Sequence, residues 1–250
     1  AERFSVEHQT DVLHAVLASM REHLDAPVVQ LYGCEALSQF ASVRAHGGEV
    51  DVVAAGGIEM ILQAAKAHGS DRLVLEHGLE ALALLADNAE TQTLIAKADG
   101  VEVVMEVMRA NAAAAVVQEK CLRLLALLAK KRRDIRARIT NEGGLDSVMA
   151  AMRAHLAVDT VQEHGCLALV SLAVANLEES VDISEEVRVV VAAMDAHFQV
   201  AVVQEVGCRA IASAAANNPG QHMAIVQQGG LRCVLQGMRE HLQVAGVQER

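Results

Sequence analysis

The apolar residues of this chain recur with the spacing of amphipathic helices. After Gly144 they fall at Leu145, Val148, Met149, Met152 and Leu156. Steps of three and four residues place such side chains on one face of a helix. A second run after Gln162 has the same spacing, with apolar or small residues at Cys166, Leu169, Val170, Leu172 and Ala173. The pattern predicts consecutive helices separated by short breaks.

Two short sequence motifs recur along the chain at a fixed distance from one another. The first is Val-Gln-Glu followed by a small residue and Cys, and its second position falls at Gln30, Leu75, Gln118, Gln162, Gln204 and Gln248, in steps of 45, 43, 44, 42 and 44 residues. The second is Gly-Gly or a substitute, which ends 18 residues before the last five of these positions, at Gly57, Gly100, Gly144, Glu186 and Gly230. Such a period predicts tandem structural repeats.

Each repeat is expected to hold three helices, of which the first is short. The paired glycines suit a break between helices, because glycine adopts the backbone angles that close a turn. A third helical segment precedes them, for example Asp134 to Asn141 and His222 to Gln228. We expect one domain, 1–250, with repeats at approximately 1–46, 47–87, 88–130, 131–175, 176–216 and 217–250. The last repeat reads as truncated, which predicts that the chain is a fragment of a longer solenoid.

The amino-acid sequence of these repeats resembles that of armadillo repeats, most closely those of protist and algal proteins. The segments that carry the resemblance are Ala224 to Leu231, AIVQQGGL, and Val161 to Leu169, VQEHGCLAL. The resemblance covers nearly the whole chain. It implies an all-α fold, a right-handed α-solenoid of about six three-helix repeats, whose third helices line a concave side where partners bind.

Composition narrows the classes of function. The chain is 52% hydrophobic and only 2% aromatic, so Ala, Val, Leu, Ile and Met must fill its core. Its formal net charge of −11 disfavours nucleic acid as a partner, because phosphate binding depends on Lys and Arg. No uninterrupted apolar segment is long enough to cross a membrane. No phosphate loop, nucleophile motif or zinc motif is present, so we expect no enzymatic activity, no small-molecule substrate, no metal and no cofactor.

Cysteine and histidine each recur at one position of the repeat. Four of the five cysteines do so, Cys34, Cys121, Cys166 and Cys208, and we interpret them as small buried residues of a protein kept in a reducing compartment. Histidine recurs 11 residues after the glycine position, at His23, His68, His155, His197 and His241, with Asn111 in its place once. These residues are expected to cap the second helix, or alternatively to form a pH-sensitive edge.

One segment is strongly basic in an otherwise acidic chain. It consists of Lys130, Lys131, Arg132, Arg133, Arg136 and Arg138. It lies where the third repeat meets the fourth. The segment is either a solvated loop and helix edge or a docking site for an acidic or phosphorylated partner.

The candidate binding surface is a row of third-helix positions counted from the recurring cysteine. Its members are Glu35, Gln39, Glu76, Glu80, Gln118, Leu122, Glu163, Leu167, Ser171, Glu205, Arg209 and Ser213. Import receptors of the armadillo family place Trp and Asn on this row, and neither occurs here. Five carboxylates against Arg209 alone predict a partner with a basic or mixed-polar helix or extended segment.

The sequence therefore predicts a non-enzymatic scaffold or adaptor that binds another protein. Two alternatives remain open at this point. The chain could be the regulatory or targeting region of a larger enzyme, such as a kinase or ubiquitin ligase, or a structural spacer in a large assembly such as a ciliary or motor complex. We expect an intracellular, cytoplasmic location, with the nucleus or cilium as alternatives.

Overall fold

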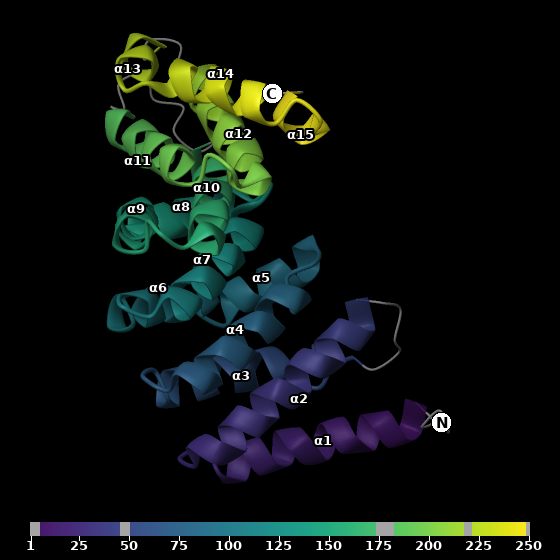
Figure 1. Ribbon diagram of the computed structural model, residues 1–250. Helices are drawn as coiled ribbons and strands as arrows, with labels where there is room; N and C mark the ends of the chain where they lie inside the picture. The colour runs from purple at the N-terminus through teal and green to yellow at the C-terminus, as the bar shows by residue number, and fades with distance from the viewer. Residues whose placement is uncertain (1–5, 46–50, 174–182, 218–221, 249–250) are drawn as a thin grey trace. The chain divides into compact units, whose positions relative to one another are not determined.

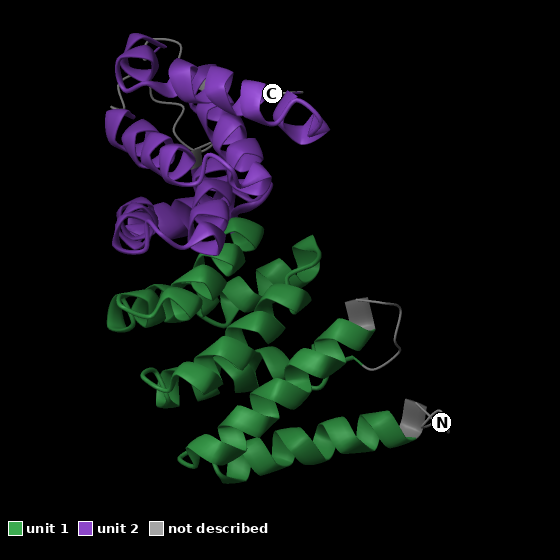
Figure 2. Ribbon diagram, in the orientation of Figure 1, with its two compact units in different colours: residues 1–128 green, residues 129–250 purple. Residues whose placement is uncertain are grey.

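The chain forms two compact units, residues 1–128 and residues 129–250 (Figure 2). A computed structural model describes residues 6–45, 51–173, 183–217 and 222–248 (Figure 1). All regular structure within these ranges is helical. The prediction of an all-α solenoid is confirmed. Repeats 1 to 6 are numbered in chain order, from 1–46 to 217–250.

Unit 1 holds repeats 1 to 3. Its helices are α1 (Val6–Glu22), α2 (Pro27–Ala45), α3 (Gly57–Ala67), α4 (Arg72–Leu85), α5 (Ala89–Lys97), α6 (Gly100–Ala110) and α7 (Ala115–Ala129). Repeat 3 shows the expected order of a short first helix, α5, followed by α6 and α7. The third helices of repeats 1 and 2, α2 and α4, pack extensively along one another.

Unit 2 holds repeats 4 to 6. Its helices are α8 (Arg133–Asn141), α9 (Gly144–Ala154), α10 (Asp159–Ala173), α11 (Ser184–Ala196), α12 (Ala201–Asn217), α13 (His222–Gln227), α14 (Gly230–Glu240) and α15 (Ala245–Gln248). The short first helices predicted at Asp134–Asn141 and His222–Gln228 are present as α8 and α13. The corresponding segment of repeat 5 falls largely on 174–182, outside the described residues. Here α10 and α12 make the most extensive helix pair.

The glycine pair separates the first helix from the second for two distinct reasons. The first glycine has a positive φ, 76° at Gly143 and 86° at Gly229, and residues other than glycine rarely adopt this backbone conformation. The second glycine is approached closely, because a Cβ at Gly144 would collide with the side chain and carbonyl of Ile139. Asp99 takes the first place in repeat 3 with φ of 62°, a conformation that Asp tolerates better than most residues.

Within the described residues, repeat 2 has turns between residues 51 and 56, where repeats 3 and 4 have the end of their short first helix. The Asp51 carboxylate accepts hydrogen bonds from the backbone N–H groups of Val53 and Ala54, at 3.0 and 3.1 Å, and so closes a turn. Val52 is fully buried and contacts Gly57 as Ile139 contacts Gly144. One buried side chain thus supplies the apolar anchor that a short helix supplies elsewhere.

Candidate functional site

A buried glutamine fixes how each third helix sits against the second helix of the same repeat. Gln162 is fully buried, and its Nε2 donates hydrogen bonds to the carbonyl oxygens of Met152, at 3.0 Å, and His155, at 2.9 Å. The same pair of bonds, to the residues ten and seven positions earlier, is made by Gln30, Gln118, Gln204 and Gln248. We call this arrangement the glutamine clamp. It supplies a side-chain donor to two carbonyls at the end of a helix; that of His155 also accepts a hydrogen bond from the backbone N–H of Val158, at 2.9 Å.

Repeat 2 lacks the clamp. Leu75 occupies the glutamine position and is completely buried. A leucine side chain offers no donor to the carbonyls at the end of α3. Packing alone therefore holds α4 against this turn at that position.

The clamp corrects the sequence-based register in repeat 3. Counting from Cys121 placed Gln118 and Leu122 on the exposed row, but they are 2% and 0% exposed. In repeat 3 Cys121 follows the clamp glutamine by three residues, whereas Cys166 follows Gln162 by four. Because Gln118 makes the same hydrogen bonds as Gln162, the two glutamines are equivalent, and Cys121 corresponds to Gly165 of repeat 4. The row in repeat 3 is then formed by Glu119 and Arg123.

With this register the third helices present the same set of positions within each unit. We call it the third-helix ladder, one, five and nine residues after the clamp position. In unit 1 it comprises Leu31, Glu35, Gln39, Glu76, Glu80, Leu84, Glu119, Arg123 and Leu127; in unit 2 it comprises Glu163, Leu167, Ser171, Glu205, Arg209 and Ser213. All of these residues are half-buried except Gln39, which is exposed. Ten of the twelve predicted site residues belong to this set.

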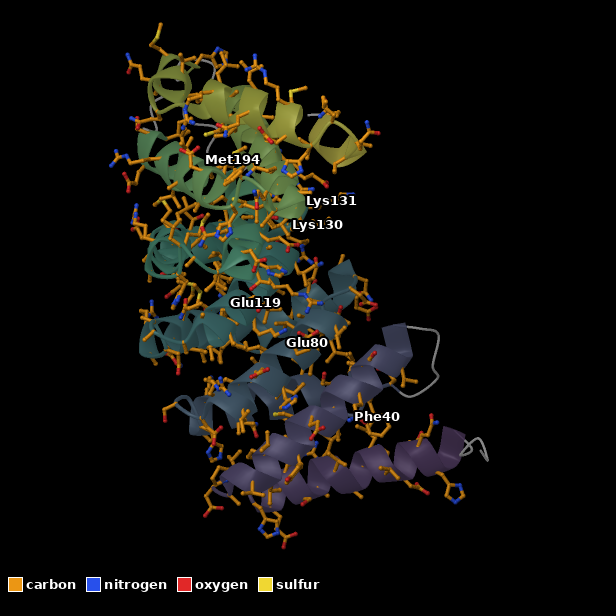
Figure 3. All side chains as sticks on the ribbon, viewed as in Figure 1. Phe40, Glu80, Glu119, Lys130, Lys131 and Met194 are labelled. Carbon is orange, nitrogen blue, oxygen red and sulfur yellow. The ribbon has the colours of Figure 1, made fainter. Side chains whose placement is uncertain are left out.

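The ladder of unit 1 carries an ion-pair cluster rather than acids alone. The Arg123 guanidinium lies 2.7 and 2.8 Å from the two carboxylate oxygens of Glu80, and the Lys120 ammonium lies 2.8 Å from one of them. Glu80 is labelled in Figure 3 together with Glu119, whose carboxylate lies 3.5 Å from the same ammonium. Burial opposes the charge on Glu80, yet hydrogen bonds from Lys120 and Arg123 outweigh it and lower the pKa of this carboxyl. The expectation of five carboxylates opposed by Arg209 alone is therefore wrong.

Four acids of the ladder remain without such a partner. Within the described residues, Glu35, Glu76, Glu163 and Glu205 make no hydrogen bond or ion pair. Arg209 stands among them in unit 2, and its Nε is buried with no hydrogen-bond partner in the described part of the chain. The free charges of the ladder are thus mainly negative, with cations at fixed places.

The recurring histidines join neighbouring repeats. The second helices α3, α6, α9, α11 and α14 have their C-cap at this position, for example His68 and His197. The ring Nε2 then reaches the turn of the preceding repeat: His197 lies 2.7 Å from the carbonyl of Leu156, and His241 lies 2.8 Å from that of Phe198. In repeat 3 the Asn111 amide donates to the Gly69 carbonyl at 2.8 Å. We call these bonds the inter-repeat staples; capping at these positions is confirmed.

Comparisons with known proteins agree with this geometry. The LRRK2 ARM repeat family matches residues 3–135, which is more than half of the chain. The chain belongs to this armadillo-repeat family. No curated protein is a significant match to the chain. The matched residues lie mainly in unit 1. The glutamine clamp recurs at the equivalent repeat positions in unit 2.

A solved structure shows the same fold. It is the crystal structure of an engineered protein, a target of the Northeast Structural Genomics Consortium, with a TM-score of 0.76 and 22% identity over 95% of this chain and 92% of that chain. At this identity the likeness concerns the fold alone. Armadillo solenoids are typically scaffolds that bind other proteins, and the fold does not specify the partner.

The basic segment of this armadillo protein is not one exposed patch. Lys130, Lys131 and Arg133 are exposed, the first two being labelled in Figure 3. Arg132 instead donates two hydrogen bonds to the Asp134 carboxylate, at 3.1 and 2.8 Å. Arg138 is half-buried.

Arg136 does not belong to the exposed basic surface. It is 5% exposed, and its guanidinium donates to the carbonyl of Ala129 at 3.3 Å. Arg136 follows Ile135 on the buried side of the short helix α8, so it is drawn into the core with that side. The expectation that it contributes to a docking surface is wrong.

The cysteines of the armadillo repeats have the environment of core residues. All five are free and buried. Burial raises the pKa of the Cys34 and Cys166 thiols to about 12, and it also raises that of Cys121. A thiol with so high a pKa is a poor nucleophile and a poor metal ligand. The described residues contain no group of three or more His, Cys, Asp or Glu placed to hold a metal ion, and no described helix is long and apolar enough to cross a membrane.

Proposed function

We propose that the third-helix ladder binds a basic or mixed-polar segment, helical or extended, of another protein. The observation that carries this proposal is the ladder itself: within each unit it is a row of mainly polar, mostly half-buried side chains, and the glutamine clamp fixes its register in every described repeat except repeat 2. Half-buried positions combine contact area with access for a partner. Armadillo repeats in general mediate protein–protein interactions, which supports a binding role over catalysis.

The charge of the partner follows from the acids that have no partner within the chain. These acids are Glu35 and Glu76 in unit 1 and Glu163 and Glu205 in unit 2. They attract Lys or Arg, and because their carboxylates are already partly desolvated, pairing costs little further desolvation free energy. Glu80 differs, since Lys120 and Arg123 already neutralise it. Arg123 in unit 1 and Arg209 in unit 2 would donate hydrogen bonds to a carboxylate or carbonyl of a partner, which favours a mixed-polar segment over a purely basic one.

The proposal is tested by selecting peptides against the full chain from a random peptide library displayed on phage. Selected sequences should be enriched in Lys and Arg, and their affinity should fall with rising salt. Reversing two free acids, in the double variant Glu76→Lys with Glu163→Lys, should weaken binding about thirtyfold, because each reversed contact costs on the order of 1 kcal/mol.

The matched control is Glu106→Lys, an exposed acid on the second helix α6 that lies off the ladder. This variant should bind like the wild type. Selection of acidic or uncharged peptides, or equal affinity for the ladder variant and the wild type, would overturn the proposal.

The buried free thiols support a reducing, intracellular location for this interaction. Exposed Lys130, Lys131 and Arg133 remain candidates for a separate contact with an acidic partner.

A further inference from the structure

The turn that joins α7 to α8 concentrates positive charge in an acidic protein. Five of the seven residues from 130 to 136 are Lys or Arg, whereas the whole chain has a formal net charge of −11. Lys130, Lys131 and Arg133 are exposed, and their side chains make no hydrogen bond or ion pair within the described residues. Figure 3 labels Lys130 and Lys131 at this turn. The turn lies in the middle of the chain, between repeats 3 and 4 and away from both ends.

These cations lie at the end of a helix where positive charge is unfavourable. Helix α8 begins at Arg133, and its aligned backbone dipoles give this end a partial positive charge, which repels cations and attracts anions. In repeat 3 the equivalent helix, α5, has Asn88 as its N-cap, and the Asn88 side chain accepts hydrogen bonds from the backbone N–H groups of Glu90 and Thr91. Arg132 takes the N-cap position in repeat 4 and makes no such bond. Repeat 4 thus has cations where repeat 3 has a stabilising cap.

A buried arginine lies beneath the turn. Arg136 is 5% exposed, and its guanidinium donates to the Ala129 carbonyl at 3.3 Å, the carbonyl that also accepts the backbone N–H of Arg132. The Nε of Arg136 is buried without a hydrogen-bond partner, and no acid of the described chain pairs with this guanidinium. Burying a charge without an opposite charge beside it costs free energy.

The fold does not require the charge of Arg136. In repeat 3 the equivalent residue, four positions after the N-cap, is Gln92, whose Nε2 donates to the Ala86 carbonyl at 3.3 Å. Ala86 and Ala129 both lie 11 residues after the clamp position of their repeat. A neutral amide therefore makes in repeat 3 the bond that the guanidinium makes in repeat 4. What the arginine adds is positive potential at the turn above it.

The distribution of charge selects a compact anion. Asp134 is the one acid in this segment, and Arg132 neutralises it through two hydrogen bonds. Charge interactions extend over about 8 Å at physiological salt, so an anion held at the turn is influenced mainly by the cations there. A nucleic acid or a membrane surface would extend over the acidic remainder of the chain, which repels it. A phosphate ester instead concentrates about two negative charges and three acceptor oxygens in one group.

We propose that Lys130, Lys131 and Arg133 bind a phosphorylated side chain in a segment of another protein. Their ammonium and guanidinium groups would donate charge-assisted hydrogen bonds to the phosphate oxygens, and the N-terminus of α8 would add its partial charge. Arg136 would not touch the ligand, but its charge would strengthen binding from below. The phosphate would in turn offset the cost of collecting these cations at one turn. This site is separate from the third-helix ladder and does not depend on its function.

Immobilised random peptide libraries that differ in one fixed central residue test the proposal. The central residue is phosphoserine in one library, serine in the second and glutamate in the third. The full chain should bind the phosphoserine library about tenfold more tightly than the serine library, and more tightly than the glutamate library, because glutamate carries a single charge and two acceptor oxygens.

Reversing the exposed lysines locates the site. Lys130→Glu together with Lys131→Glu should weaken binding of the best phosphopeptide more than about tenfold. The matched control is Lys66→Glu together with Lys97→Glu, which reverses two exposed lysines on α3 and α5 and changes the net charge equally. The control should bind like the wild type. Both variants should fold, since all four side chains are exposed.

Arg136→Gln separates the charge of this residue from its part in the fold. The variant should unfold at about the same urea concentration as the wild type, because Gln92 makes the same bond in repeat 3, and it should bind the phosphopeptide about threefold more weakly. The ladder variant Glu76→Lys with Glu163→Lys should bind the phosphopeptide no more weakly than the wild type, which distinguishes this site from the ladder.

Three results would refute the proposal. The first is equal binding of the phosphoserine and glutamate libraries. The second is an equal loss of affinity in the Lys130 and Lys131 variant and in its control. The third is tighter binding of a single-stranded DNA oligomer than of the best phosphopeptide, which would point to an extended anion.

Discussion

The ring Nε2 of His68 lies 2.8 Å from the carbonyl oxygen of Leu24 in the preceding repeat. The staple joins the second helix of repeat 2 to the turn that follows the second helix of repeat 1. The alternative that the recurring histidines form a pH-sensitive edge stays a prediction.

His68→Ala should lower the free energy of unfolding by about 1 kcal/mol, the usual contribution of one hydrogen bond. His68→Asn should recover part of this loss, because Asn111 makes the same bond one repeat later. Urea unfolding measures both variants. Equal stability of His68→Ala and the wild type would show that the staple contributes nothing to the fold.

Gln162→Ala should be among the most destabilising polar substitutions in unit 2. It removes the side-chain donor from the Met152 carbonyl and one of the two donors from the His155 carbonyl, and it opens a buried cavity. We expect a loss of about 2–4 kcal/mol from the two effects together. The control is the neighbouring Glu163→Ala, which removes a half-exposed side chain with no partner and should change stability little. The two variants would be compared by chemical unfolding.

Leu122 and Arg123 decide between the two registers of repeat 3. Leu122→Ala should cost about 2–5 kcal/mol, because the side chain is completely buried. Arg123→Ala removes one cation from Glu80 and should cost about 1 kcal/mol. If the order of these losses in thermal or chemical unfolding were reversed, the register based on the glutamine clamp would be wrong.

This register shows what the sequence could and could not supply. Helix type, repeat length and the glycine breaks follow from local spacing, so they were predictable. Whether the ladder positions should be counted from the glutamine or from the cysteine could not be predicted, because it depends on which of the two residues is hydrogen-bonded to another helix. The partners of Glu80 come from a helix about 40 residues away, and only packing reveals that Lys120 and Arg123 face it. Arg136 was misplaced for a similar reason, because its charge predicted exposure while its helix face decided burial.

Glu80→Gln should destabilise the protein by about 1–2 kcal/mol at neutral pH. The pKa of Glu80 is lowered in the folded state, so its contribution is complete above the unfolded value of about 4.3 and disappears as the pH falls through the folded value. The variant and the wild type should therefore converge in stability in acid. Unfolding followed from neutral pH to pH 3 checks this convergence, with Glu76→Gln as the unpaired control that should show no such difference.

Gly165→Ala should destabilise repeat 4 by about 1–3 kcal/mol through overpacking. A Cβ at this position would collide with the Met152 side chain, and Gly33 and Gly207 approach Met20 and Met194 in the same way. Gly69→Ala is the control, since its Cβ would meet only ordinary contacts of 3.5 Å or more. Similar melting temperatures for the two variants would argue against a tight methionine contact.

Leu75 has a mechanical consequence for unit 1. In repeats 1 and 3 the third helix secures the turn at the end of the second helix with two hydrogen bonds, from Gln30 and Gln118 respectively, while in repeat 2 the side chain at that position, Leu75, makes only apolar contact. Hydrogen bonds resist shear over a short distance, whereas apolar surfaces slide past one another more readily. When unit 1 is stretched, repeat 2 is therefore the element expected to yield first, and Leu75→Gln should raise the force at which it does.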